Sequence, residues 1–352
     1  MVMQRIIVKL ISKGIFFLFL IILMTACAPG ALQVTITPEE PVEVSPQPVE
    51  TEPAETQIVS SEQSVVLLAA DSETDPVVVS QIQAVLENLV STSEHRLIIE
   101  ENFSRTMITP DVLIVVLVGS AQDLPEIAAA NAQVMFVAVG GPQAQPAENI
   151  LVIGDSLLDQ QHQAFMAGYL SALVSRDYKV AALIPSDADQ TDRMLDAFIT
   201  GVRFYCGICR PLFPPYNTFP QWEMLASENA VQGFQTSIDT LVNNGVEVLF
   251  VPQLLHSTEL LAYLSELGVK VVSDASPDSP GNNWVGTVTT DPAAVLVSLW
   301  PEIIDGTDGV KVPSPIAVID TGSGLLTEGR RYLFDEMAEN LRMNLVLPES
   351  VP

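Results

Sequence analysis

Residues 112–119, Val-Leu-Ile-Val-Val-Leu-Val-Gly, and residues 134–141, Val-Met-Phe-Val-Ala-Val-Gly-Gly, decide the fold. Both are continuous apolar runs, without the polar alternation of a strand that has one face in water. Each run is short, rich in valine and ended by glycine, which favours a strand over a helix. Residues 124–131, between them, have a helical pattern. A strand, a helix and a second strand in this order predict neighbouring parallel strands that are buried on both faces.

The same alternation of short apolar runs and helical stretches extends from residue 64 to residue 340. Strands are predicted at 65–70, 96–100, 112–119, 134–141, 150–154, 179–185, 246–252, 270–273, 284–289 and 315–320. Helices are predicted at 75–90, 124–131, 157–175, 191–205, 227–244, 257–267, 291–304 and 327–340. This order predicts an α/β fold with parallel sheets and helices on both faces of each sheet.

The predicted architecture has two doubly wound parallel-sheet lobes joined by a hinge. The helix at 157–175 is the expected crossover, because large apolar residues recur along it at i+4 spacing. With a boundary near residues 174–178, the N-terminal lobe comprises 63–176 plus 288–345, and the C-terminal lobe comprises 177–287. A cleft between two hinged lobes suits a ligand.

The first 26 residues have the form of a signal peptide. Three basic residues and no acid precede an apolar run, Ile15 to Met24, that is too short to span a bilayer as a helix. Small residues then lead directly to Cys27, which resembles a bacterial lipobox. An ordinary secretory cleavage or an N-terminal membrane anchor has no use for this small-small-Cys ending. We therefore expect removal of residues 1–26 and a lipid on Cys27, at the extracytoplasmic face of the bacterial cell membrane.

Residues 27–62 predict an extended, disordered tether. The segment is rich in Pro, Glu, Thr and Val, and no Lys or Arg occurs between Gly14 and His95. Proline fixes φ and removes hydrogen-bond donors, and like charges repel one another, so this segment has little capacity to form a core.

The charge balance excludes whole classes of partner. The chain of 352 residues has 43 Asp and Glu against 15 Lys and Arg, for a net charge of −28. Such a surface repels nucleic acid and anionic lipid headgroups. A mean hydropathy of +0.34 still indicates a well-filled core. Beyond the leader no long apolar stretch occurs, so we expect no transmembrane span.

Cys206 and Cys209 are the two cysteines left after the lipidation site. In an exported protein, two thiols three residues apart favour a local disulfide. The pair resembles a thioredoxin motif only superficially, because Cys206 ends a helical pattern, and a helix C-terminus disfavours a thiolate. We expect a structural disulfide. The aromatic and Pro-rich segment that follows, 213–222, suits either surface packing or a lid over the cleft.

The sequence has no motif for catalysis, a cofactor or a metal. The signatures Gly-x-Ser-x-Gly, Gly-x-x-x-x-Gly-Lys-Ser/Thr and Gly-x-Gly-x-x-Gly are absent. His95, His162 and His256 are far apart, and their spacing does not match a zinc site. Thr-Gly-Ser-Gly at 321–324 is interpreted as a tight loop. We therefore expect no enzyme activity, no cofactor and no metal.

Candidate ligand-binding residues stand where predicted strands end, because ligands bind at the carboxyl ends of strands in doubly wound sheets. They are Asp71, Ser72, Ser120, Gly140, Gly141, Gln253 and Asp274. Asp187 also follows a strand, but a helix begins soon after it, so we expect it to cap that helix. No helix follows Asp274 at once, which leaves ligand contact and a turn role both open.

Three segments carry a resemblance to a known family. They read Gln163-Ala-Phe-Met-Ala-Gly-Tyr-Leu-Ser-Ala-Leu-Val-Ser175, Lys179-Val-Ala-Ala-Leu-Ile184 and Asp196-Ala-Phe-Ile-Thr-Gly-Val-Arg-Phe204. In this order they resemble the Phe-Leu-Ala-Gly helix, the Lys-Val-Gly strand and the Phe-x-x-Gly helix of the basic membrane protein family. The similarity covers about residues 112–205. Members of that family are lipid-anchored solute-binding proteins of ABC importers, often for purine nucleosides, so the resemblance implies the type I periplasmic binding fold.

The resemblance also implies two ligand contacts. Asp274, in Val272-Ser-Asp-Ala275, matches the family's ribose-binding Asp. The family's first loop usually reads Asp-Lys-Ser-Phe-Asn, and in Asp75-Pro-Val-Val-Val79 only Asp75 matches it. The family's later Gly-rich loop is replaced by Pro252-Gln-Leu-Leu-His256.

The leading hypothesis is an extracytoplasmic, lipid-anchored solute-binding protein. It would capture a small molecule, a nucleoside or another polar solute, between two lobes and present it to an ABC permease without catalysis. One alternative is a diverged envelope sensor or scaffold that has no transport ligand. The other is an exported thiol oxidoreductase that uses Cys206 and Cys209.

Overall fold

The computed structural model describes residues 64–70, 74, 76–119, 123–142, 144–306 and 308–349. The leader, the lipidation residue Cys27 and the tether predicted at 27–62 lie outside the described residues. Within the described part, no helix has both the length and the apolar character needed to cross a membrane.

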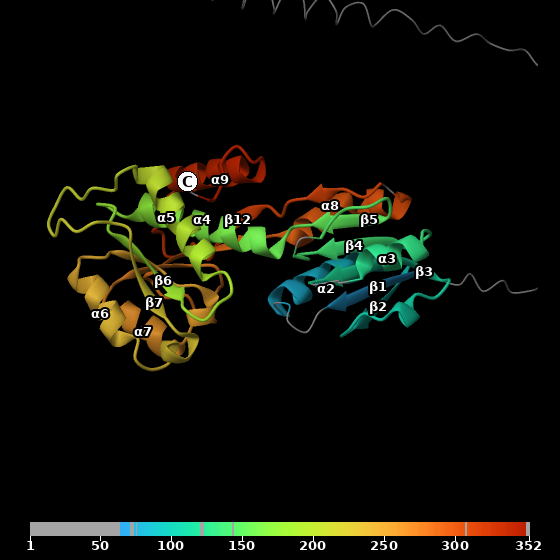
Figure 1. Ribbon diagram of the computed structural model, residues 1–352, viewed down its shortest axis with the longest axis horizontal. Helices are drawn as coiled ribbons and strands as arrows, with labels where there is room; N and C mark the ends of the chain where they lie inside the picture. The colour runs from blue at the N-terminus through green and yellow to red at the C-terminus, as the bar shows by residue number, and fades with distance from the viewer. Residues whose placement is uncertain are drawn as a thin grey trace, which may run out of the picture. The chain divides into compact units, whose positions relative to one another are not determined.

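The first sheet has six strands, all parallel, in the order β11-β5-β4-β3-β1-β2 (Figure 1). Its strands are β1 (Val65–Ala70), β2 (Arg96–Glu100), β3 (Val112–Val118), β4 (Met135–Val139), β5 (Ile150–Ile153) and β11 (Lys311–Val312). The first five confirm the predicted strands, and the sixth, of two residues, was not predicted.

Both faces of the first sheet are buried, which explains its continuous apolar strands. Val66 and Leu68 of β1 enter one core together with α2 (Pro76–Ser91) and α8 (Pro292–Asp305). Leu67, on the opposite face of the same strand, enters another core together with α3 (Leu124–Ala130). Successive residues of a strand point to opposite faces, so a sheet covered on both sides needs an apolar residue at every position.

The second sheet also has six strands, in the order β12-β10-β9-β8-β6-β7. They are β6 (Val180–Pro185), β7 (Gln221–Leu225), β8 (Val248–Phe250), β9 (Lys270–Ser273), β10 (Trp284–Thr290) and β12 (Ile316–Ile319). β12 is antiparallel to β10, and the other neighbours are parallel. Together the two sheets confirm the predicted α/β class.

The helices that pack against the second sheet are α4 (Ser156–Val174), α5 (Thr191–Cys206), α6 (Gln235–Asn243), α7 (Thr258–Glu266) and α9 (Glu328–Arg342). Short 3-10 turns are η2 (Arg105–Met107), η3 (Ser227–Ala230) and η4 (Gln253–Leu255). Residues from all five of these α-helices enter the core of the second sheet. The helix predicted at 227–244 is shorter than expected. Its start forms the 3-10 turn η3, and only α6 is α-helical.

Two glycines allow α4 and α5 to pack closely, side by side (Figure 1). A Cβ added to Gly168 of α4 would lie 2.2 Å from the carbonyl oxygen of Phe198. A Cβ added to Gly201 of α5 would lie 1.9 Å from the carbonyl oxygen of Phe165. Each helix thus meets the backbone of the other, which only residues without a side chain permit.

The chain passes between the two sheets three times. It leaves the first sheet between β5 and α4, returns between β10 and α8, and leaves again between β11 and β12. The sheet membership therefore differs from the expected lobe boundaries. The first passage lies near Gly154, before the expected boundary at 174–178, because α4 packs in the core of the second sheet. In the segment expected to return whole, 288–345, α8 and β11 join the first sheet while β12 and α9 join the second.

A buried ion pair fixes the Pro-rich segment at the amino end of β6. Asp177 and Lys179 lie 3.3 Å apart, with side chains that are 5% and 8% exposed. The Asp177 carboxylate accepts hydrogen bonds from the backbone N–H groups of Leu212, at 2.6 Å, and Phe213, at 3.1 Å. The Lys179 ammonium also donates to the Pro214 carbonyl, 3.2 Å away. The segment is thus bound at the edge opposite to the carboxyl ends of the strands, which supports packing and contradicts a lid over those ends.

Candidate functional site

The candidate site consists of the loops at the carboxyl ends of the parallel strands. Of the residues predicted there, Gly140, Gly141, Gln253 and Asp274 are described by the structure. The remaining candidates lie outside the described residues, so their roles stay predictions: Asp71, Ser72, Asp75 and Ser120.

In the first sheet, the strands β3, β4 and β5 each end on a glycine with positive φ. The φ angles are 94° at Gly119, 66° at Gly140 and 70° at Gly154. A residue with a side chain rarely adopts these angles, so glycine lets the chain turn away from the sheet at once. A Cβ on Gly140 would have no neighbour within 4 Å, whereas Gly141 is packed against the Gly119 carbonyl. The edge therefore offers open space at Gly140, whereas a Cβ on Gly154 would lie 2.5 Å from the Ser314 hydroxyl and 2.7 Å from the Asp159 carboxylate.

In the second sheet, the structure brings Asp274 and Gln253 together. The Asp274 carboxylate accepts a hydrogen bond from the backbone N–H of Gln253, at 2.7 Å. Asp274 thus ties the loop after β9 to the loop after β8. A carboxylate has about four acceptor positions, so it can accept from several donors at once.

A histidine adjoins this pair. The Nε2 of His256 lies 2.8 Å from the hydroxyl of buried Ser273, and the imidazole ring meets Trp284 edge-on, with ring centres 6.1 Å apart. Burial lowers the pKa of His256 below its ordinary value of 6.5. The ring is therefore neutral at pH 7 and can both donate and accept a hydrogen bond.

A second carboxylate, Asp320, stands directly after β12 with a positive φ of 56°. It accepts hydrogen bonds from the hydroxyl of Thr287, at 2.8 Å, and from the hydroxyl of Ser276. Thr287 in turn accepts from the indole N–H of Trp284, at 3.2 Å. In the strand register, Thr287 pairs with Ser273, the last residue of β9. Asp320 therefore belongs to the same edge as Asp274, although the sequence analysis did not select it.

Asp187 has a different role from the one expected. Its carboxylate accepts hydrogen bonds from the backbone N–H of Ser227, at 3.1 and 3.2 Å, and from the hydroxyl of Ser227, at 2.9 Å. The bond from the Ser227 hydroxyl is the main reason that the pKa of Asp187 is lowered. Helix α5 begins after Gln190, without a side-chain cap. The helix-cap prediction is wrong, and Asp187 instead links the loops after β6 and β7.

A group of polar residues lies where the chain passes between the sheets. The ammonium of Lys311 lies 3.0 Å from the Asp155 carboxylate. The Asp159 carboxylate accepts a bond from the backbone N–H of Asp155, at 3.3 Å, and is hydrogen-bonded to buried Ser314. Burial is the main reason that the pKa of Asp159 rises from 3.8 to about 7, and the negative charge of Asp155 adds to the rise. Asp155 and Asp159 lie at the first passage between the sheets, and Lys311 and Ser314 lie at the third. Their contacts therefore connect these two passages.

The cysteine pair is a disulfide, as predicted, with Cα atoms 4.9 Å apart. Cys206 is the last residue of α5, and Cys209 is 2% exposed. A helix C-terminus and burial both disfavour a reactive thiolate, so this geometry suits a structural brace. Among the described residues, no group of three His, Cys, Asp or Glu side chains could hold a metal ion.

Neither a protein-family model nor a curated protein matches the chain. Solved structures do share the fold. A transcriptional activator of the comK gene from Bacillus halodurans has a TM-score of 0.57 at 12% identity, over 81% of this chain and 100% of that chain. An ABC transporter solute-binding protein from Conexibacter woesei has a TM-score of 0.55 at 15% identity, over 82% and 98%. Another from Aeropyrum pernix has a TM-score of 0.51 at 12% identity, over 81% and 87%.

These similarities confirm the type I periplasmic binding fold that the sequence predicts. Identities this low establish the fold alone, and the same fold occurs in a regulator and in solute-binding proteins. The chemistry of this chain must therefore be inferred from its own residues.

Proposed function

We propose that this protein is an extracytoplasmic solute-binding protein, anchored by a lipid on Cys27, that captures a small polar molecule for an ABC permease. The solute would lie between the carboxyl ends of the strands of the two sheets and would be bound without chemical change. The chain forms two sheets and passes between them three times. This arrangement supports the proposed function, because it permits the two lobes to close around a ligand.

The observation that carries the proposal is the presence of two carboxylates, Asp274 and Asp320, at the edge of the second sheet. Asp274 follows β9 and accepts from the backbone N–H of Gln253, and Asp320 follows β12 and accepts from the hydroxyl groups of Ser276 and Thr287. Carboxylates accept hydrogen bonds from ligand hydroxyl or amino groups, and such charge-assisted bonds are stronger than neutral ones. Carboxylates at this edge favour a neutral or cationic solute rich in donors over an anion.

Within that class, a nucleoside is the solute that we propose to test first. The match of Val272-Ser-Asp-Ala275 to a ribose-binding segment motivates it. Two neighbouring ribose hydroxyls could both donate to the Asp274 carboxylate, in addition to the N–H of Gln253 from which it already accepts. Asp75, the one residue that matches the family's first loop, is the contact that we propose on the other side of the solute.

Thermal unfolding of the mature chain with nucleosides, ribose and hexoses tests the proposal, because a solute that binds only the folded state raises Tm. Calorimetry then gives Kd for each stabilising solute. Asp274→Ala should raise Kd at least tenfold, as expected for the loss of a charge-assisted bond worth about 1.5–3 kcal/mol.

Two further variants separate ligand contact from loop bracing. Asp274→Asn keeps an oxygen that can accept from the Gln253 N–H but removes the charge, so it should also weaken binding. Asp278→Ala removes an exposed acid from the same loop and should leave Kd unchanged. If no solute raises Tm, or if Asp274→Asn binds as tightly as the wild type, this function is wrong for this edge.

A further inference from the structure

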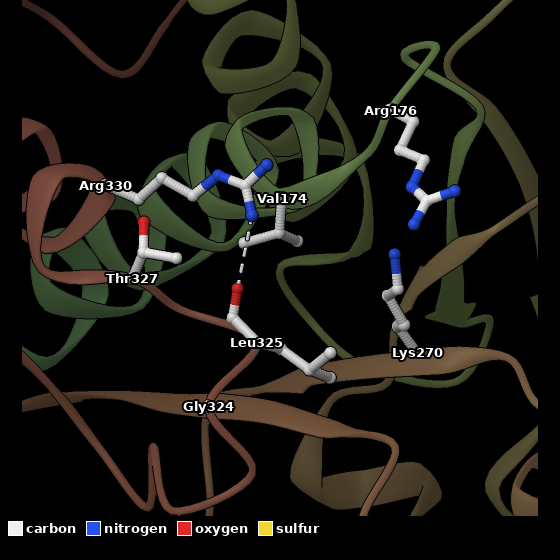
Figure 2. Close-up of a pocket in the computed structure, with 7 residues that line it drawn as sticks. All are labelled: Val174, Arg176, Lys270, Gly324, Leu325, Thr327 and Arg330. Carbon is white, nitrogen blue, oxygen red and sulfur yellow. Dashed lines mark hydrogen bonds between the residues drawn. The ribbon is translucent and has the colours of Figure 1, made fainter.

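A pocket that is separate from the candidate site concentrates positive charge. Its volume is about 290 Å³, and Figure 2 shows the side chains around it. It is lined by Val174, Arg176, Lys270, Gly324, Leu325, Thr327 and Arg330. Three of these seven residues are cations and none is an acid, in a chain where Asp and Glu outnumber Lys and Arg by 43 to 15.

The pocket lies at the amino end of the second sheet. Lys270 is the first residue of β9, and Val174 is the last residue of α4. Gly324 and Thr327 belong to the loop that leads into α9. The candidate solute site is at the opposite, carboxyl end of β9, beyond Ser273. The two sites are therefore separate.

The cations of the pocket have no carboxylate partner among the described residues. Throughout the described ranges, the ion pairs involve other basic residues and leave Arg176, Lys270 and Arg330 without a carboxylate partner. Arg330 donates one hydrogen bond, to the carbonyl of Leu325 at 3.3 Å. The neighbouring Asp177 carboxylate is already bound to Lys179.

The side chains also point toward a common space. Figure 2 shows the guanidinium of Arg176 and the ammonium of Lys270 directed at one another across a gap, with Arg330 approaching from α9. Arg176 is exposed and Lys270 is half-buried, and like charges that face each other repel. Thr327 adds a hydroxyl at the start of α9, a helix of 15 residues whose N-terminus carries partial positive charge.

We propose that this pocket binds a phosphate-class oxyanion, either inorganic phosphate or the phosphate group of a small ester. A tetrahedral dianion between Arg176 and Lys270 would replace their repulsion by two attractions. The planar guanidinium forks suit bidentate contact with such oxygens. The anion would thereby join α4, β9 and the loop before α9, three elements of the second sheet's core.

Thermal unfolding of the mature chain tests this site at constant ionic strength. Inorganic phosphate and glycerol 3-phosphate are titrated separately against sodium chloride, so the two sources of the phosphate group are distinguished. We expect a saturable rise of Tm with at least one of them and none with chloride. An equal rise in chloride, or none with either phosphate, would overturn the proposal.

The variant Arg176→Gln/Lys270→Gln should weaken the apparent affinity for phosphate at least tenfold. The control Arg193→Gln/Arg210→Gln removes the same charge from exposed positions and should change it by less than twofold. In chloride alone, Lys270→Gln should be at least as stable as the wild type, because it relieves repulsion with Arg176. If phosphate affinity falls equally in both double variants, general charge attraction explains the effect and the site is refuted.

Discussion

Replacing Asp159 by Asn should remove a pH-dependent loss of stability. The Asp159 carboxyl is buried where the chain passes between the sheets, near Asp155, Lys311 and Ser314. Its pKa is about 7 in the folded protein against 3.8 for an unperturbed carboxyl. Between these two values the folded chain holds a proton that the unfolded chain has released.

The sign and size of the effect follow from proton linkage. Because the folded state binds more protons over this window, the free energy of unfolding decreases as the pH rises from about 4 to about 7. A change in pKa of this size corresponds to about 4 kcal/mol. Asn carries no charge at any pH, and its oxygen can still accept from the Asp155 N–H. Asp159→Asn should thus be more stable than the wild type at pH 8 and lose that advantage toward pH 4.

Urea unfolding at pH 4 to 8, followed by circular dichroism, measures the difference between wild type and variant. Subtraction removes every titration that the two proteins share. The control Asp189→Asn changes an exposed acid and should give a difference that is independent of pH. A difference in unfolding free energy between the wild type and Asp159→Asn that stays constant within about 1 kcal/mol over this range would refute the reasoning.

Three further predictions concern packing, charge and export. Gly201→Ala should lower the free energy of unfolding by about 1–3 kcal/mol or more, since the new methyl group overlaps the Phe165 carbonyl; urea unfolding checks it. Asp177→Ala should cost about 3–5 kcal/mol in the same assay, because it leaves Lys179 buried without its partner. Cys27→Ser should abolish labelling by a fatty-acid probe in cells, and equal labelling of both proteins would contradict lipid attachment at this residue.

The sheets were predictable because buried parallel strands are visible in the sequence. β3 and β4 are apolar at every position, as two covered faces require. β7 was missed, since this edge strand alternates between partly and fully exposed residues and follows a Pro-rich segment. β11 has two residues, too few for any pattern.

The passage of the chain between the sheets was harder to place. Helix α4 is buried on nearly all sides over its second half, so its sequence does not indicate which sheet it covers. Its packing against Gly201 of α5 decides the matter, and that contact depends on the close approach of two backbones. The division of residues 288–345 between the sheets likewise depends on strand pairing rather than on hydrophobic pattern.

The candidate site was predicted in part. Asp274 and Gln253 were found because they follow strands, and the structure joins them. Asp320 was not found because it lies inside the strand predicted at 315–320, and because β12 is antiparallel to β10, so only the strand register brings Asp320 to this edge. Asp159 could not be found either, because it lies inside a helical pattern and its partners Lys311 and Ser314 are distant in the sequence.

The late position of two edge strands has a consequence for biosynthesis. Lys311 of β11 pairs with Val152 of β5, and Ile319 of β12 pairs with Thr287 of β10. Until these residues have left the ribosome, both sheets have an unfilled edge with unpaired N–H and C=O groups, which favours pairing with other chains. A product that ends before residue 311 should therefore aggregate rather than form a smaller stable protein. Both sheets are completed only near the end of synthesis, so the chain must be kept from premature association until it is nearly whole.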